Sequence, residues 1–127
     1  MTTSTAHRLR KHADFQRVYK AGRKQFSKQI GYFHAIRTPE SQQHSATLGP
    51  RIGLTVPKAL GKAVDRNRIK RRMREAVRHA LPLLSAPADL VLHPRRTVID
   101  LDFATLEREV AQIFRTVQKA CDKAAQP

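Results

Sequence analysis

The 127-residue chain has no tryptophan, a single cysteine and no long apolar segment, and these absences exclude several classes of protein. Cys121 alone cannot form an intramolecular disulfide, which is typical of a protein in the reducing cytoplasm. No segment approaches the roughly 20 apolar residues of a membrane-spanning helix. Residues 1–6 are not followed by the apolar run of a signal peptide. We therefore expect a cytoplasmic protein without a membrane partner.

The residues that protein nucleases use are also sparse. A nuclease site needs carboxylates that hold a metal ion, or histidines that exchange protons. The ten acidic residues and six histidines of this chain are dispersed along the sequence. One cysteine cannot complete a zinc site, and the sequence has no glycine-rich phosphate-binding loop. The sequence therefore predicts no catalytic residue and no metal site in the protein itself.

Positive charge is what the chain has in excess. It contains 25 Lys and Arg against ten Asp and Glu, which leaves a net charge of +15 and a pI near 11.3. So large an excess repels itself in a compact fold, and a polyanion is the usual partner that relieves it. Apolar residues make up 40% of the chain, enough for one globular domain with a modest core.

Three helices are predicted from residues spaced three and four apart. The first is capped by Asp14 and stops at Gly22. The second begins near Asp65 and is ended by Pro82. Asp102 caps the last helix, whose apolar stripe consists of Leu106, Val110, Ile113, Phe114 and Val117.

Strands are predicted over residues 30–36, 51–56 and 89–93, which are short and rich in apolar residues. Residues 38–50 are rich in Ser, Gln, Thr, Gly and Pro, and are predicted to form a flexible hairpin loop between the first two strands. The predicted order is helix, strand, strand, helix, strand, helix.

Domain boundaries follow from the composition of the two ends. Residues 1–12 are polar and then basic, which predicts a flexible N-terminal arm. A single domain is expected over residues 13–120, and residues 121–127 are expected to be a frayed tail.

The helix over residues 66–78 (RNRIKRRMREAVR) carries most of the functional information, because seven of its thirteen residues are Lys or Arg and only Glu75 is acidic. Helical spacing gathers apolar residues on one side: Ile69, Met73, Ala76, Val77 and Ala80. The opposite side carries Asn67, Lys70, Arg71, Arg74 and Arg78, with Arg68 and Arg72 at its flanks. We expect the apolar side to pack against the core and the basic side to face a ligand.

Like charges three and four residues apart on this helix oppose its formation by roughly 0.2–0.5 kcal/mol a pair. Bound phosphates would reverse that effect, and the planar guanidinium of Arg can grip phosphate oxygens with two hydrogen bonds. Calmodulin targets, membrane-surface helices and leucine-zipper DNA readers share this pattern. The chain lacks zipper heptads, and a strand rather than a helix precedes the basic helix, so RNA is favoured over DNA.

Residues 51–78 (RIGLTVPKALGKAVDRNRIKRRMREAVR) closely resemble the signature of the bacterial ribonuclease P protein subunit. The similarity continues upstream in HRLRKHADFQRVYKAG and downstream in ADLVLHPRR and the last helix, so it covers most of the chain from about residue 7 to residue 120. RNRIKR is its most specific element. Ala59 departs from the pattern, since the family usually has a second Lys there, and Pro94 interrupts the usual approach to the basic pair that follows it.

The resemblance implies an α+β fold: a two-layer sandwich of about three helices on a mixed four-stranded sheet, with a left-handed βαβ crossover, as in the second domain of ribosomal protein S5. It also implies an RNA-binding subunit of an RNA enzyme. In that family the RNA uses bound Mg²⁺ to remove the 5′ leader from precursor tRNA, and the protein binds both the catalytic RNA and the leader. No obligatory protein partner is implied.

The family's binding positions carry over to two groups of residues. The signature helix and its approach imply contacts with the catalytic RNA by Lys58, Lys62, Arg66, Asn67, Arg68, Lys70, Arg71 and Arg74. The first helix and the sheet imply a leader-binding cleft with Phe15, Tyr19 and Phe33. Two alternatives remain from the residues alone: a structural RNA-binding protein of the ribosomal type, and a self-sufficient protein nuclease.

Overall fold

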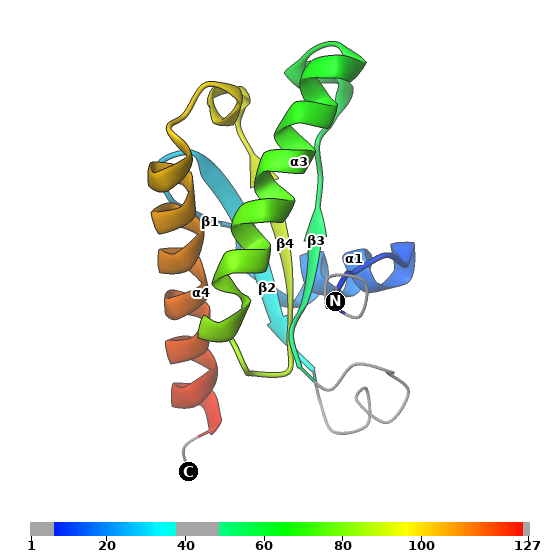
Figure 1. The fold of residues 1–127 in the computed structure, drawn as a ribbon. Helices are drawn as coiled ribbons and strands as arrows, with labels where there is room; N and C mark the ends of the chain where they lie inside the picture. Colours follow the sequence, from blue (N-terminus) through cyan, green and yellow to red (C-terminus); the bar gives the residue numbers. More distant parts are fainter. Residues whose placement is uncertain (1–6, 38–48, 126–127) are drawn as a thin grey trace.

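The computed structural model of the protein describes residues 7–37 and 49–125 (Figure 1). The helices are α1 (His12–Ala21), α3 (Ala63–Ala80) and α4 (Phe103–Ala125), and the strands are β1 (Gln25–Phe26), β2 (Ile30–Ile36), β3 (Arg51–Leu54) and β4 (Ala88–Pro94). Three short 3₁₀ helices connect them: η1 (Lys58–Leu60), η2 (Leu81–Leu83) and η3 (Arg96–Ile99). No helix of the described residues is long and apolar enough to cross a membrane.

The four strands form one mixed sheet in the order β1-β2-β4-β3. β2 is antiparallel to both β1 and β4, whereas β3 and β4 are parallel and joined through α3. With α3 in front of the sheet, as in Figure 1, the chain passes from β3 to β4 on its left. The crossover is therefore left-handed, against the strong general preference, and the expected mixed sheet and crossover are confirmed.

The prediction that residues 38–50 form a hairpin loop between two paired strands is wrong. β4 lies between β2 and β3, so these two strands do not pair. The periodicity of β2 and β3 identifies both as strands but carries no information about which neighbour each one takes. Most of the loop, residues 38–48, lies outside the described residues.

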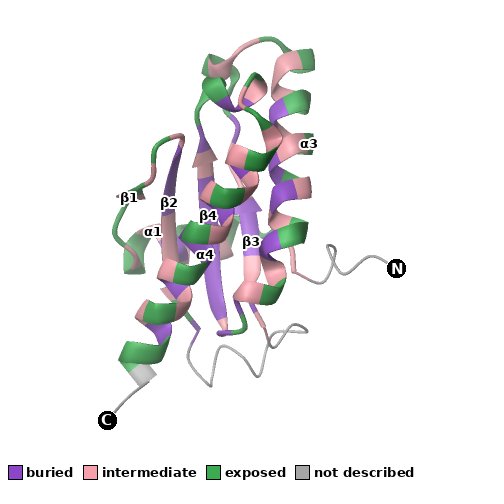
Figure 2. Ribbon diagram, turned by 60° about the vertical axis from the view of Figure 1, so that its left-hand side comes forward, coloured by how far each residue is buried: buried purple, intermediate pink, exposed green. Residues whose placement is uncertain are grey.

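The main core lies between the sheet and the α3/α4 layer, as the burial colours of Figure 2 show. Alternate residues of β2 and β4 point into it, among them Tyr32, Leu90 and Leu92. The expected stripe of α3 is buried at Ile69, Met73, Ala76 and Ala80, with Val77 half-buried, and all five stripe residues of α4 are buried. Each large side chain buried in this way contributes about 1.5–3 kcal/mol.

α1 packs on the other face of the sheet and adds a partial third layer to the two-layer sandwich. Val18 of α1 and Val91 of β4 are fully buried there, together with Leu9. Phe33 points to this face because it follows Tyr32 in β2, and consecutive strand residues face opposite sides. This second, smaller cluster positions the first helix over the sheet.

The described part of the expected N-terminal arm belongs to the fold. The backbone N–H of Leu9 donates to the carbonyl of Ile52 (2.9 Å), and the N–H of Ile52 donates to the carbonyl of His7 (2.7 Å). Leu9 is buried, and residues 1–6 lie outside the described residues. At the other end α4 continues to Ala125 and buries Cys121, because the apolar stripe extends one turn further than expected.

The predicted helix ends are partly corrected. α1 begins at His12 with Lys11 at its cap, and Asp14 lies in its first turn instead of capping it. Gly22 ends α1 as predicted, and a Cβ atom there would overlap the carbonyl of His34. The two-residue strand β1 was not predicted, because two residues are too few to show a period.

Candidate nucleic-acid interface

The basic side of α3 forms a groove, which we call the α3 groove. It is lined by Arg8, Asn67, Lys70, Arg71, Arg74, Glu75 and Arg78. Glu75 pairs with Arg78, its neighbour one turn along the helix (2.5 Å). Lys70, Arg71 and Arg74 form no ion pair with any residue that the structure describes. The groove therefore presents a row of uncompensated positive charges to solvent, spaced along a rigid helix.

Four of the eight residues assigned to the catalytic RNA by resemblance lie together in the α3 groove: Asn67, Lys70, Arg71 and Arg74. Arg68 is exposed but does not line the groove. The Arg66 side chain turns back, and its Nε donates to the carbonyl of Gly61 (3.2 Å). Lys58 and Lys62 are exposed in the segment that leads to α3.

The segment before α3 is shaped by Gly61 and Arg96. Gly61 has a φ of 136°, a conformation that side chains disfavour, and a Cβ atom there would overlap the Arg96 guanidinium. Arg96 donates to the carbonyl of Leu60 (2.6 Å) and lies 3.5 Å from the Asp65 carboxylate. Arg96 therefore holds the approach to α3 in place, a role that the sequence did not suggest.

Arg72 is a structural residue, although it is next to Arg71 in sequence. Its Nε donates to the carbonyl of Val98 (2.9 Å), and its guanidinium also hydrogen-bonds the carbonyl of Leu101. The same group lies over the ring of Phe103, 5.8 Å from its centroid. Arg72 thus ties α3 to the start of α4 and is not available to a ligand.

On the other face of the sheet, Tyr19, Phe33 and His93 form what we call the aromatic cluster. The rings of Tyr19 and Phe33 meet edge to face with centroids 5.0 Å apart, and His93 lies 5.8 and 5.6 Å from them. The Tyr19 hydroxyl is within hydrogen-bonding distance of His93 Nε2 (3.3 Å) and of Thr55 Oγ1 (3.4 Å). All three rings are partly exposed.

Sequence reasoning missed His93, because a lone His in a strand has no motif around it. Burial lowers the pKa of this imidazole, and the charge of Lys24 lowers it further. His93 is therefore neutral near pH 7, and the cluster offers largely uncharged ring surface.

Phe15, the third expected leader residue, lies beside this cluster and not within it. Its ring packs so closely on Gly53 of β3 that a Cβ atom there would overlap it. Phe15 and Tyr19 are one turn apart on α1, and both pack against the Leu9, Val18 and Val91 cluster. The structure thus places Phe15, Tyr19 and Phe33 on one side of the sheet.

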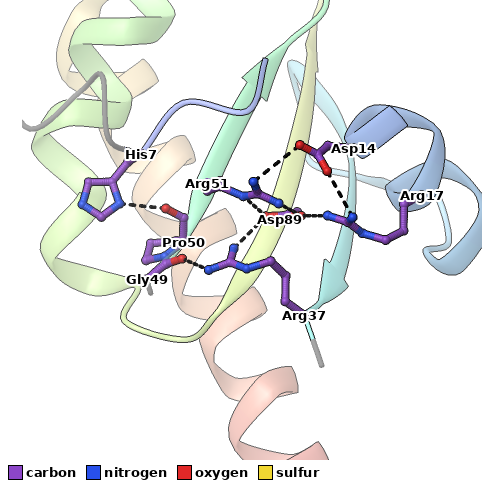
Figure 3. Close-up of polar contacts among 8 residues, drawn as sticks. All are labelled: His7, Asp14, Arg17, Arg37, Gly49, Pro50, Arg51 and Asp89. Atoms are coloured by element: carbon purple, nitrogen blue, oxygen red, sulfur yellow. Dashed lines mark hydrogen bonds and ion pairs between the residues drawn. The ribbon is translucent and has the colours of Figure 1, made fainter. Parts of the chain in front are cut away.

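Asp89 lies at the centre of a network of three arginines (Figure 3). Its side chain is completely buried. Arg51 donates from Nε and Nη2 to the two carboxylate oxygens, each at 2.8 Å. Arg37 donates to Oδ1 (2.7 Å) and Arg17 to Oδ2 (2.5 Å). Asp14 adds a second carboxylate, 3.1 Å from Arg17 and 3.4 Å from Arg51.

The Asp89 network was not predicted. Its members come from α1, β3 and β4 and from the residue after β2, so no local spacing relates them. The one signal was an acidic residue inside an otherwise apolar strand. Burial raises the pKa of Asp89, but hydrogen bonds and charges from the arginines outweigh burial and hold that pKa below its usual range.

Two further contacts hold Gly49 and Pro50, the residues just before β3. Arg37 also donates to the carbonyl of Gly49 (2.5 Å), and His7 Nδ1 donates to the carbonyl of Pro50 (2.7 Å) (Figure 3). Within the described residues, no group of three His, Cys, Asp or Glu side chains is placed to hold a metal ion.

Comparison with known proteins gives a consistent result. The sequence model of the Ribonuclease P family matches residues 3–118. The ribonuclease P protein component of Bacillus velezensis is 34% identical over 109 residues, covering 86% of this chain and 87% of that protein. The ribonuclease P protein component of Chloroflexus aggregans is 39% identical over 123 residues, covering 91% and 78%.

Solved structures agree with the sequence relatives. The ribonuclease P protein of Staphylococcus aureus superposes with a TM-score of 0.70 at 27% identity, covering 88% of this chain and 95% of that one. The protein from Thermotoga maritima, at 24% identity, shares the fold with a TM-score of 0.70 over 86% and 96%. By its sequence, and with the same fold, the chain belongs to the ribonuclease P protein family.

Proposed function

We propose that the chain, as the protein subunit of the ribonucleoprotein endoribonuclease P, binds the catalytic RNA through the α3 groove and the 5′ leader of precursor tRNA through the aromatic cluster and Phe15. The observation that carries this proposal is the separation of two chemically different surfaces in a chain of this family. One surface is a row of unpaired cations, and the other is a set of partly exposed rings.

The α3 groove fits the phosphates of a folded RNA. Arg71 and Arg74 are one turn apart and point away from the core, so a backbone that follows the groove would meet both. Contact with phosphates is insensitive to sequence, and it weakens with salt as counterions return to the RNA. We extend the interface to Arg66, Arg68, Lys58 and Lys62, which flank the groove and its approach.

The aromatic cluster fits a single strand of variable sequence. Every base has an apolar face, so stacking on Tyr19 or Phe33 contributes roughly 1–3 kcal/mol for each base with little sequence preference. Leaders differ between tRNA precursors, and a stacking surface tolerates that difference. Because mature tRNA has no leader, these contacts favour the precursor over the product.

Among the residues that the structure describes, no group of three His, Cys, Asp or Glu side chains could hold a metal ion. The carboxylates of Asp14 and Asp89 are both engaged by arginines. We therefore assign the metal ions of the reaction mainly to the RNA, and we propose that the protein acts in the cytoplasm with the catalytic RNA and precursor tRNA and without an obligatory protein partner. No step of the hydrolysis is assigned to a side chain.

The test is a cleavage assay with purified components. The protein is added to a ribonuclease P RNA and a precursor tRNA at low Mg²⁺, and release of the 5′ leader is followed over time. We expect the protein to accelerate release and to have no activity without the RNA. A protein of the ribosomal type would bind RNA without stimulating cleavage, and cleavage without the RNA would indicate a protein nuclease.

A further inference from the structure

A hollow at the edge of β3 adjoins the two surfaces described above. It lies between the N-terminal segment, α1 and the C-terminal half of α3, with a volume of about 270 Å³. Apolar side chains line it, among them Phe15, Leu54 and Val77, and so do the arginines Arg8 and Arg74. We call it the β3-edge hollow.

The position of Arg8 is fixed by the backbone. Residues 7–9 pair with Ile52 through the two hydrogen bonds already described, and Arg8 forms an isolated parallel bridge with that residue. The Arg8 side chain forms no hydrogen bond or ion pair with any residue that the structure describes, and the same is true of Arg74. Both side chains nevertheless line the α3 groove as well as the hollow.

Bringing two unpaired guanidinium groups together opposes folding. Burial lowers the pKa of Arg74, and the nearby charge of Arg8 lowers it further. Glu75 does not compensate the pair, because it is engaged by Arg78. An anion bound between Arg8 and Arg74 would convert this repulsion into attraction, since each guanidinium can donate two hydrogen bonds to a phosphate.

We propose that the β3-edge hollow binds one unpaired nucleotide of the 5′ leader, with the base against the apolar lining residues and its phosphate between Arg8 and Arg74. This inference rests on the proposed function. The combination of apolar side chains and two arginines in one lining matches a nucleotide, which has an apolar face and a charged phosphate. The volume of the hollow is close to the lower limit for small-ligand pockets, which is roughly 300 Å³.

We assign this nucleotide to the leader because Phe15 belongs both to the proposed leader-binding surface and to the β3-edge hollow. Tyr19 and Phe15 lie one turn apart on α1. Tyr19 contacts Thr55, just after β3, and Phe15 contacts Gly53 within β3. A leader stacked on the aromatic cluster would therefore reach the hollow by passing Phe15. Bases of a double helix are paired and cannot enter such a site, whereas leader bases are free to do so. Arg74 lines both the hollow and the α3 groove, and this inference reassigns it from the catalytic RNA to the leader, whereas Arg71 remains with the catalytic RNA.

The test uses the assembled ribonucleoprotein and precursors that differ in leader length. A leader of about 2 nucleotides would be too short to reach the hollow. A leader of about 10 nucleotides would reach it, because known single-strand-binding sites cover roughly 4–16 nucleotides. We expect Arg8→Ala to weaken binding of the long-leader precursor about tenfold, the effect of one lost charge-assisted contact. The assembled ribonucleoprotein should bind the short-leader precursor and mature tRNA with unchanged affinity.

Two controls separate this effect from net charge and from misfolding. Arg115→Ala removes the same charge from an exposed position on α4 and should leave the affinity for the long-leader precursor unchanged. Because Arg8 and Arg74 repel each other in the free protein, Arg8→Ala should leave the melting temperature unchanged or raise it. A lower melting temperature would assign Arg8 a structural role instead.

Three results would overturn the proposal. Equal losses for both precursors together with weaker binding of the catalytic RNA would assign the hollow to that RNA. An unchanged affinity for every RNA would leave the hollow without a nucleotide. If Arg8→Ala has no effect while Tyr19→Ala weakens binding of both precursors relative to mature tRNA, the proposed function stands and only the hollow is misassigned.

Discussion

Arg51 binds Asp89 through both arms of its guanidinium, Nε to Oδ1 and Nη2 to Oδ2, each at 2.8 Å. The two residues lie directly opposite each other on the parallel strands β3 and β4. Arg37, whose side chain is as deeply buried as that of Asp89, completes the pairing from the end of β2. The Asp89 carboxylate therefore pairs with one arginine from β3 and one that follows β2, beneath α1.

Removing that carboxylate should destabilise the protein strongly. In Asp89→Asn the shape is kept but the negative charge is lost, which removes the buried ion pairs that Arg37 and Arg51 make with this carboxylate. Breaking a buried pair in this way costs about 3–5 kcal/mol. Urea unfolding monitored by circular dichroism gives the free energy, with Asp100→Asn at an exposed position as the matched control. A loss below about 0.5 kcal/mol, the range of ordinary surface substitutions, would contradict the assigned role.

Acid should destabilise the protein through the same residue. The pKa of Asp89 is lower in the folded protein than in the unfolded chain, where it is about 3.9, so the unfolded chain binds this proton more tightly. The stabilisation is thus complete above the unfolded-state pKa and is lost as the pH falls through the folded-state pKa. We expect the difference in unfolding free energy between wild type and Asp89→Asn to shrink below about pH 4. A constant difference from neutral pH down to acid would contradict this.

Arg71 and Arg72 are adjacent in sequence but should respond oppositely to substitution. Arg72→Ala removes the donors to the carbonyls of Val98 and Leu101 and should lower the unfolding free energy by about 1–3 kcal/mol. Arg71→Ala should change it by less than about 0.5 kcal/mol, because Arg71 is exposed. The two variants control for each other, and equal destabilisation would contradict the assignment of Arg72 to the fold.

Gly61 should not tolerate a side chain. Gly61→Ala would place a methyl group at a φ of 136° and against the Arg96 guanidinium, at a cost of about 1–3 kcal/mol. The contact between Arg96 and Leu60 should be lost at the same time, which would release the segment before α3. Limited proteolysis of residues 58–62 measures that release, with Ala59→Ser as a nearby control. Unchanged stability and protease resistance would show that the segment does not depend on Gly61.

Local pattern was sufficient to predict the long elements of the fold. The stripes of α3 and α4 repeat over about three turns, and β2 has seven residues rich in apolar side chains, so their periods are clear. Pairing order was not predictable from the pattern, because nothing in β2 or β3 indicates that β4 lies between them. The left-handed crossover was known only from the resemblance, since general rules favour the other hand.

The candidate site was predictable where it follows one helix and not where it joins several elements. Asn67, Lys70, Arg71 and Arg74 share one side of α3, and helical spacing alone groups them. Arg8 joins them only because residues 7–9 pair with β3, and His93 joins Tyr19 only through the sheet. Arg72 was expected at the flank of the basic side, because it lies about 100° around the helix from Arg71. The carbonyl groups that it binds are distant in sequence, so the pattern did not indicate its structural role.

The separation of two RNA surfaces is tested most directly by measuring two affinities for two variants in parallel. Arg71→Ala should weaken binding of the catalytic RNA and flatten its salt dependence by about 0.7–0.9 in the log–log slope, with an unchanged ratio of precursor to mature tRNA affinity. Tyr19→Ala should leave binding of the catalytic RNA unchanged and lower that ratio roughly 5- to 150-fold, the effect of one lost stacking contact of about 1–3 kcal/mol. If both variants weaken both affinities alike, the two surfaces do not have separate partners.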